Sequence, residues 1–133
     1  MTWTRFMDMH SGGSCKEKPF EYIYIEAPES EAEVIFYNRF GHNPGRVSCT
    51  CCGSDYSVQD HDSLEQASAY DRNCEWSKEK GEYVEEERER FPGSGYKTLE
   101  EYADSPDVLI IPASEIKPEE RTGEIPEQGY VWV

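Results

Sequence analysis

The 133-residue sequence contains no long apolar run and few basic residues. Its longest all-apolar runs, such as residues 108–111, are far shorter than the roughly 20 residues that a membrane-spanning helix requires. Residues 1–10 lack the basic and apolar regions of a secretory signal peptide. We therefore expect a soluble protein of the cytoplasm.

Basic residues are scarce: 13 lysines and arginines stand against 28 aspartates and glutamates, so the formal net charge is −15 at pH 7. An acidic surface repels the phosphates of nucleic acids, and we expect no direct nucleic-acid ligand. The acidic surface instead favours fast, salt-sensitive association with a protein that has a basic surface. Phosphate-binding Walker loops, G-x-S-x-G and G-x-G-x-x-G are also missing, which disfavours catalysis without excluding it.

Aromatic residues, in contrast, are plentiful enough to build a core, with nine Tyr, five Phe and three Trp. Alternating apolar and polar residues predict strands at 3–9 and 20–26, the second with isoleucines on one face and Phe20 and two tyrosines on the other. The apolar run at 108–111 predicts a central strand. The apolar residues at 130–133 predict an edge strand that docks beside it.

Capping signals predict three helices. The first starts at Pro28, has capping-box spacing at Ser30 and Glu33, and ends at Gly41. The second runs over 63–73, and the third starts at Thr98 and offers Leu99, Tyr102 and Ala103 to the core. A loop is expected over 41–62.

These elements predict one compact α+β domain over residues 1–133. We expect a small mixed or antiparallel sheet with two to three short helices and a zinc-knuckle loop. Residues 1–75 hold the metal loop, residues 76–96 the acidic segment, and residues 97–133 a C-terminal helix and strand.

The cysteines indicate a metal site. Their odd number, five, and the crowding of three of them at 49–52 disfavour disulfides. Cys49 and Cys52, followed by Gly53, have the C-x-x-C-G spacing of a zinc knuckle, in which backbone N–H groups point at the thiolates. Cys74 is the best third ligand.

For the fourth ligand we rank His10 first, then Cys15, His61 and His42. Four protein ligands make a structural zinc site, because a catalytic site keeps one position open and no H-E-x-x-H motif supplies a base. Two alternatives stay open: unmetallated core cysteines, and redox or catalytic use of a thiol.

Two segments are candidate partner-binding surfaces. The charged run at 75–90 is most simply a solvated strand or helix face. A more specific interpretation is that Glu85, Glu86, Glu87 and Glu89 form a docking surface for a basic partner. Tyr130 and Trp132 of the apolar closing strand are the second candidate, which could also join two copies of the chain.

Three blocks of the sequence, at 3–13, 21–28 and 36–41 with 49–53, resemble a family of small proteins encoded by tailed bacteriophages, for which no activity is established. The resemblance implies the cytoplasm of an infected bacterial host and transfers no catalytic residues. Small acidic phage proteins often act as inhibitors or decoys for host machinery.

The leading hypothesis is therefore an accessory protein that binds and inhibits or redirects a host protein, as an anti-defence or host-takeover factor, for instance as a nucleic-acid mimic. A structural zinc would stabilise it. The alternatives are an enzyme of unknown type that uses the Cys/His region, and a virion or assembly component.

Overall fold

The computed structural model describes residues 2–8, 20–41, 43–45, 47–49, 56–88, 90, 92–93, 95–125 and 130–132, with the backbone alone at 47–49 and 130–132. Its strands are β1 (Trp3–Asp8), β2 (Tyr22–Ile25), β3 (Val47–Cys49), β4 (Tyr56–His61), β5 (Cys74–Ser77), β6 (Glu82–Glu85), β7 (Val108–Ile111) and β8 (Tyr130–Trp132). Its helices are α1 (Glu29–Phe40), α2 (Leu64–Ser68) and α3 (Leu99–Ala103), and the 3₁₀ helices η1 (Ala113–Glu115) and η2 (Pro118–Arg121).

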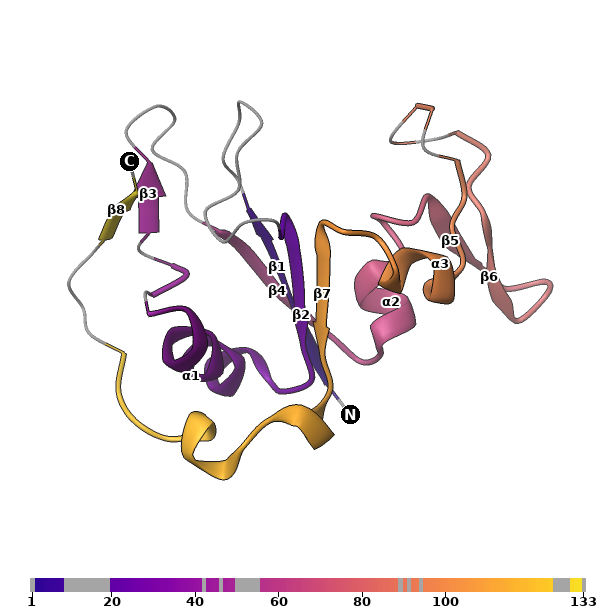
Figure 1. Cartoon of the computed structure of the whole chain (residues 1–133). Coiled ribbons are helices and arrows are strands. Elements are labelled where there is room, and N and C mark those ends of the chain that lie inside the picture. The colour runs from indigo at the N-terminus through magenta and orange to yellow at the C-terminus, as the bar shows by residue number, and fades with distance from the viewer. Residues whose placement is uncertain are drawn as a thin grey trace.

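Four strands form the main sheet, in the order β4-β1-β2-β7. β1 runs antiparallel to both of its neighbours, and β7 lies parallel to β2. The parallel pair β3–β8 and the antiparallel hairpin β5–β6 lie on opposite sides of this sheet (Figure 1). The prediction of an α+β protein with a mixed sheet and three short helices is confirmed, and its zinc-knuckle part falls largely outside the described residues.

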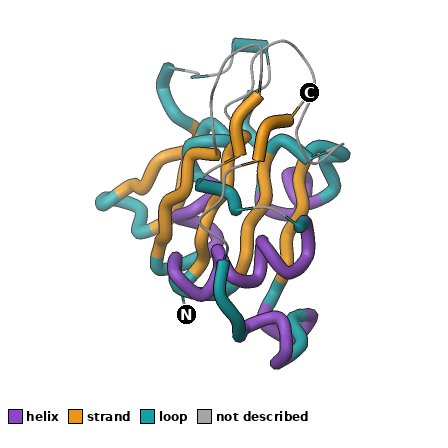
Figure 2. Tube along the Cα trace, turned by 90° about the vertical axis from the view of Figure 1, so that its left-hand side faces the viewer, coloured by secondary structure: helices purple, strands orange, loops and turns teal. Residues whose placement is uncertain are grey.

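Helices cover both faces of the main sheet. α1 lies against one face, where Figure 2 shows it in front of the strands, and α2 and α3 lie against the other (Figures 1 and 2). On the α1 side, the ring centroid of Phe36 lies 4.9 Å from that of Phe6 and 5.1 Å from that of Tyr56. The cluster on the opposite side consists of Trp3, Tyr24, Ala67, Tyr102 and Val108. The sheet is thus the middle of three layers.

The two faces of β2 were predicted from its alternation. Ile23 and Ile25 pack on the α1 side, and Tyr24 packs on the opposite side, as expected. Phe20 packs on the α1 side instead of the tyrosine side, because it precedes the strand and is not bound by the strand's alternation.

Strand partners differ from expectation in two places. β7 lies at an edge of the main sheet, although its apolar run predicted a central position. β8 pairs in parallel with β3 and not with β7, so the predicted docking beside 108–111 is wrong. The predicted loop over 41–62 contains β3 and β4, and β4 was missed because its sequence is mostly polar. An apolar pattern predicts that a segment is buried, but it does not identify the strand's neighbour.

The helix ends follow local signals more closely. Thr98 and Glu101 form the predicted capping box of α3, with both hydrogen bonds at 3.2 Å. Ser63 caps α2, which ends at Ser68 and is shorter than predicted. α1 starts one residue after Pro28 without a side-chain cap, so Ser30 lies inside its first turn. Gly41 ends it as expected. Ala103, predicted to be in the core, is exposed.

No helix in the described residues is both long and apolar enough to cross a membrane.

Candidate functional site

A buried polar cluster lies between the main sheet and the layer of α2 and α3. Arg5 of β1 makes two hydrogen bonds to Asp71, from Nε to Oδ2 at 2.7 Å and from Nη2 to Oδ1 at 2.6 Å. The Tyr24 hydroxyl donates to the same Oδ2. The hydroxyls of Tyr24 and Tyr102 lie 2.7 Å apart. Since Tyr24 gives its only proton to the carboxylate, Tyr102 must donate to Tyr24.

Burial sets the electrostatics of this cluster. The Asp71 side chain is fully buried, and that of Arg5 is only 8% exposed. Burial acts to lower the pKa of Arg5, but the bound carboxylate outweighs it and raises that pKa above its usual value. Burial first, and the charge of Asp71 second, raise the pKa of Tyr24. Burial also raises the pKa of Tyr102. The cluster is thus an ion pair with two neutral hydroxyls at neutral pH.

The turn that presents Asp71 is fixed by the two residues after it. Arg72 is buried and donates from Nε to the hydroxyl oxygen of Ser68 at 2.9 Å. Asn73 is also buried and adopts a φ of 57°, a left-handed conformation that asparagine tolerates better than most residues. Its side-chain amide donates to the carbonyl of Gly95 at 3.0 Å. These contacts hold the aspartate under the sheet.

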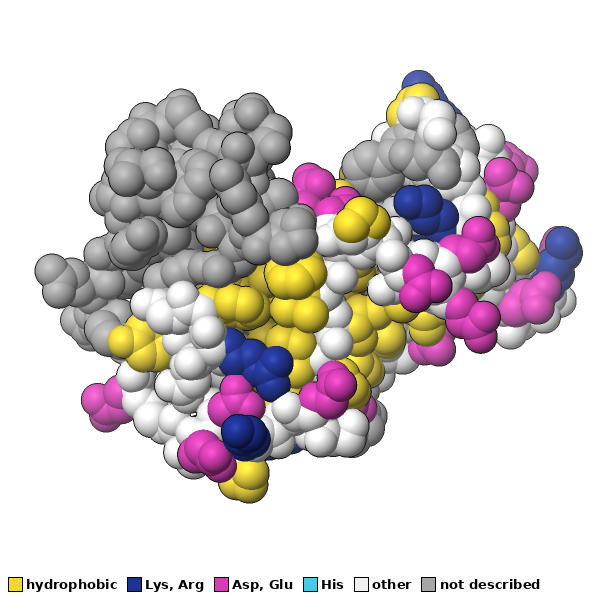
Figure 3. Space-filling view, viewed as in Figure 1, with side chains coloured by type: hydrophobic (Ala, Val, Ile, Leu, Met, Phe, Trp, Pro, Cys, Tyr) yellow, Lys and Arg dark blue, Asp and Glu magenta, His cyan; other side chains and the backbone are white. Residues whose placement is uncertain are grey.

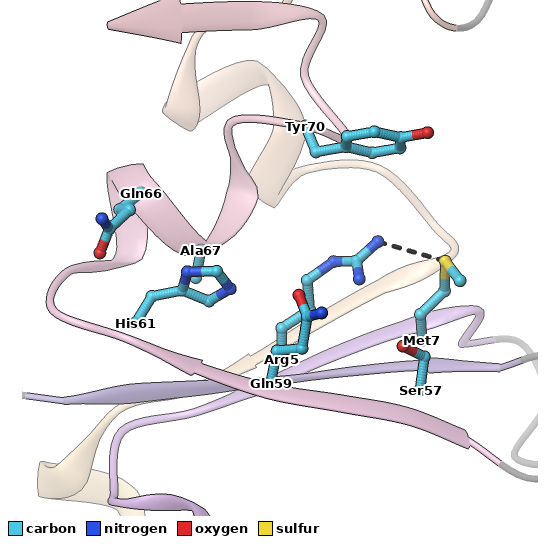
Figure 4. Close-up of a pocket in the computed structure, with 8 residues that line it drawn as sticks. All are labelled: Arg5, Met7, Ser57, Gln59, His61, Gln66, Ala67 and Tyr70. Carbon is cyan, nitrogen blue, oxygen red and sulfur yellow. Dashed lines mark hydrogen bonds between the residues drawn. The ribbon is translucent and has the colours of Figure 1, made fainter.

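A cavity of about 380 Å³ adjoins the cluster. Its floor is the face of β1 and β4 that points away from α1, and its wall is α2 with the turn after it (Figure 4). The residues that line it are Arg5, Met7, Ser57, Gln59, His61, Gln66, Ala67 and Tyr70. Arg5 therefore belongs both to the buried cluster and to the cavity.

His61 is the titratable residue at one end of the cavity. Its Nε2 atom is buried and has no hydrogen-bond partner among the described residues. Burial and the nearby charge of Arg5 lower the pKa of His61, and the carboxylates of Asp60, Asp62 and Asp71 act in the opposite direction.

The β5–β6 hairpin forms a second candidate site, because it extends away from the main sheet (Figure 1) and carries an aromatic pair with an exposed tryptophan. Trp76 is 54% exposed and stands across the hairpin from Tyr83, with their ring centroids 5.1 Å apart in an edge-to-face arrangement. Figure 3 shows acidic side chains gathered on the side of the molecule that carries this hairpin, on the right of the view. The exposed carboxylates in and beside the hairpin are Glu75, Glu79, Glu82, Glu85 and Glu87.

The structure does not bring the described zinc candidates together. Cys49 is in β3 and Cys74 is in β5, and these strands lie on opposite sides of the main sheet (Figure 1). Cys74 is a buried free thiol whose sulfur donates to the carbonyl of Ala69 at 3.5 Å. Burial raises the pKa of this thiol, which does not favour the thiolate that a metal requires.

His61, another candidate for the fourth ligand, ends β4 and lines the cavity. The remaining metal candidates fall outside the described residues: Cys52, His10, Cys15 and His42. In the part of the chain that is described, no three His, Cys, Asp or Glu side chains are grouped to hold a metal ion. The zinc site stays a prediction, centred on the C-x-x-C pair.

The predicted partner-binding residues divide into three groups. Glu85 and Glu87 are exposed as expected, and Glu86 is half-buried and forms an ion pair with Arg90 at 3.2 Å. Glu89 lies outside the described residues. Tyr130 and Trp132 belong to β8, for which only the backbone is described.

The sequence reasoning missed the polar cluster, although one signal was available. Arg5 stands between Trp3 and Met7 on the same face of a strand that was predicted to be half-buried. A charged residue at an inward position needs a buried partner of opposite charge. The position of Arg5 therefore predicts a carboxylate partner among the acidic residues of the helical segments.

Comparisons with protein-family models, with curated proteins and with solved structures found no match. The fold and these two sites therefore define the protein only as a small acidic α+β protein, with a buried ion-pair cluster and an exposed aromatic hairpin.

Proposed function

We propose that this protein is a binding protein that docks on a basic surface of another protein through the β5–β6 hairpin, and so inhibits or redirects that partner. The observation that carries the proposal is Trp76, exposed on a projecting hairpin and packed edge-to-face against Tyr83.

The aromatic pair supports this proposal on energetic grounds. A large exposed indole leaves apolar area in water that a partner can bury. Tryptophan and tyrosine are enriched among the few residues that dominate binding energy at protein interfaces. Cross-strand packing against Tyr83 restrains the Trp76 ring before binding, which reduces the entropy lost on association.

Charge supports the choice of a basic partner. Exposed glutamates lie in and beside the same hairpin as the aromatic pair, and the whole chain carries −15. Opposite charge on the partner would accelerate association and exclude acidic competitors. The lysines in the hairpin turn, Lys78 and Lys80, moderate the local charge, so we assign the binding energy mainly to the aromatic anchor.

The test begins with affinity capture from a bacterial lysate and continues with surface plasmon resonance on the purified captured protein. Trp76→Ala should weaken binding by about 2 kcal/mol, which is about thirtyfold in Kd. Glu82→Lys with Glu85→Lys should slow association, and the effect should shrink as salt is added.

The matched control is Glu115→Lys with Glu119→Lys, which reverses two exposed carboxylates in η1 and η2, far from the hairpin (Figure 1). This control should bind almost as the wild type does. The proposal fails if no protein is captured. It also fails if the captured protein binds the Trp76 variant, the Glu82/Glu85 variant and the control variant as tightly as it binds the wild type.

We place this activity in the setting that the resemblance implies, a phage-encoded accessory protein in the cytoplasm of an infected bacterium. A structural zinc at Cys49 and Cys52 belongs to the same proposal.

A further inference from the structure

The cavity over β1 and β4 is built on a part of the sheet that the helices do not fully cover. On this face, Tyr24 of β2 and Val108 of β7 pack in one cluster with Tyr102 of α3. On β1 and β4, by contrast, two cross-strand pairs face the cavity: Arg5 lies opposite Gln59, and the apolar Met7 lies opposite the polar Ser57.

Two polar side chains that line the cavity can bond to a ligand, Arg5 and His61. Within the described part of the chain, the hydrogen bonds of Arg5 use Nε and Nη2, which leaves Nη1 as a donor. The side chain is more than nine-tenths buried, and Figure 4 shows its guanidinium group lining the cavity below the Tyr70 ring. At one end of the cavity, His61 Nε2 is buried and has no described partner. Buried polar groups are normally hydrogen-bonded, so His61 Nε2 calls for a partner.

The charge around the cavity favours a neutral ligand. The positive charge of Arg5 is already balanced by the Asp71 carboxylate, at 2.6 Å and 2.7 Å. The net charge of −15 over the whole chain repels phosphates. The ligand must therefore accept a hydrogen bond from Arg5 without bringing a negative charge of its own.

The shape favours a planar ligand. Tyr70 forms the upper wall, and Arg90 stacks on its ring with the guanidinium carbon 4.3 Å from the ring centroid, which restrains the ring. Aromatic rings and arginine planes are the surfaces on which flat heterocycles stack. A volume of about 380 Å³ accommodates one such ring with a sugar attached.

We propose that this cavity binds a single uncharged nucleoside whose base has a ring carbonyl, with the base stacked on Tyr70 and its carbonyl accepting a hydrogen bond from Arg5 Nη1. His61 Nε2 bonds to a neighbouring polar atom of the same base. This site is separate from the hairpin surface and does not depend on it.

The first experiment is isothermal titration calorimetry of the full chain with uridine, adenosine, uridine monophosphate and a short oligouridylate. Uridine should bind. Adenosine, which has no ring carbonyl, should bind at least about tenfold more weakly, because a hydrogen bond to a charged donor is lost. The phosphate of the monophosphate should weaken binding, and this penalty should decrease with salt.

The same titrations distinguish the source of the base. If the oligouridylate binds more tightly than free uridine, the base belongs to a nucleic-acid strand and the proposal of an uncharged ligand is overturned. It is equally overturned if uridine does not bind at millimolar concentration, or if adenosine binds as well as uridine.

The variants use two aromatic residues of similar exposure, since removal of Arg5 would leave the buried Asp71 carboxylate without its ion-pair partner. Tyr70, at 51% exposed, lines the cavity, and Trp76, at 54% exposed, does not. Tyr70→Ala should weaken uridine binding at least about tenfold, in line with the cost of removing a base-stacking ring. Trp76→Ala should leave uridine binding unchanged. Equal uridine affinity of the Tyr70 variant and the wild type would refute the proposal.

Discussion

At the scale of single residues, the ion pair between Arg5 and Asp71 has the largest consequence for the stability of the fold. Two charges are withdrawn from water, and each is tolerated only because the other is bound in a bidentate geometry. Tyr24 supplies the carboxylate with a further donor. Loss of either charge would therefore leave the other buried without compensation.

We expect Arg5→Met and Asp71→Asn each to reduce the free energy of unfolding by about 3 to 5 kcal/mol. The double variant should lose much less than the sum, because neither charge is then left alone. Urea unfolding of the four proteins measures this coupling.

The control is the pair Arg121–Glu31, with 2.5 Å between Nη1 and Oε1 and both side chains about one-third exposed. Its coupling, measured with the corresponding glutamine variants, should not exceed about 1 kcal/mol. Additive losses at Arg5 and Asp71 would show that the two charges do not stabilise each other.

The polar cluster also shows where sequence reasoning stops. The inward position of Arg5 indicates that it needs a buried partner, but it does not identify that partner. Tyr24 and Tyr102 fit a core and Asp71 fits the end of a short helix, so none of these three residues stands out in the sequence. Their convergence depends on how β1 and β2 are placed against the turn after α2, which no local pattern encodes.

At the scale of elements, the positions of helix ends could be read from the sequence better than strand partners. Gly41, Ser63 and Thr98 act at the ends where they were expected, because capping involves only residues within one turn of each other. The neighbours of β7 and β8 were predicted wrongly, since pairing depends on segments far away in the chain.

The end of α1 can be tested with two glycines that lie close together. Gly41 has a φ of 82°, a conformation that alanine adopts only with strain, although a Cβ there would meet no atom within 4 Å. Gly41→Ala should reduce the free energy of unfolding by about 1 to 2 kcal/mol.

The matched control is Gly45→Ala. Gly45 does not have a left-handed φ, and a Cβ there would contact Asn43 Oδ1 at an ordinary 3.5 Å. Its effect should stay within about 0.5 kcal/mol. Thermal unfolding of both variants measures the two losses of stability. Equal losses would mean that the left-handed conformation does not explain why glycine occupies position 41.

At the scale of the whole molecule, the excess of negative charge opposes folding. The compact state holds a net charge of −15 in a smaller volume than the unfolded chain does, so repulsion destabilises it. The described ion pairs offset only part of this repulsion.

The melting temperature should therefore rise with added sodium chloride. Between about 0.01 M and about 0.1 M, the Debye length falls from about 30 Å to about 10 Å, and repulsion across the molecule is screened. Differential scanning calorimetry measures the shift. Sucrose, which stabilises by exclusion from the surface without screening charge, is the comparison. A melting temperature that stays constant or falls with salt would contradict this account.

The parallel pairings β2–β7 and β3–β8 have a consequence for synthesis of the chain on the ribosome. Each joins a strand from the first half of the sequence to one from the last quarter. Such distant contacts slow folding, because a long loop must close before any contact stabilises it. At translation rates of about 5 to 20 residues per second, β1 and β2 wait several seconds for β7 to be made. During that interval the edge of β2 that later binds β7 is unpaired, and the nascent chain must be protected from association with other strands.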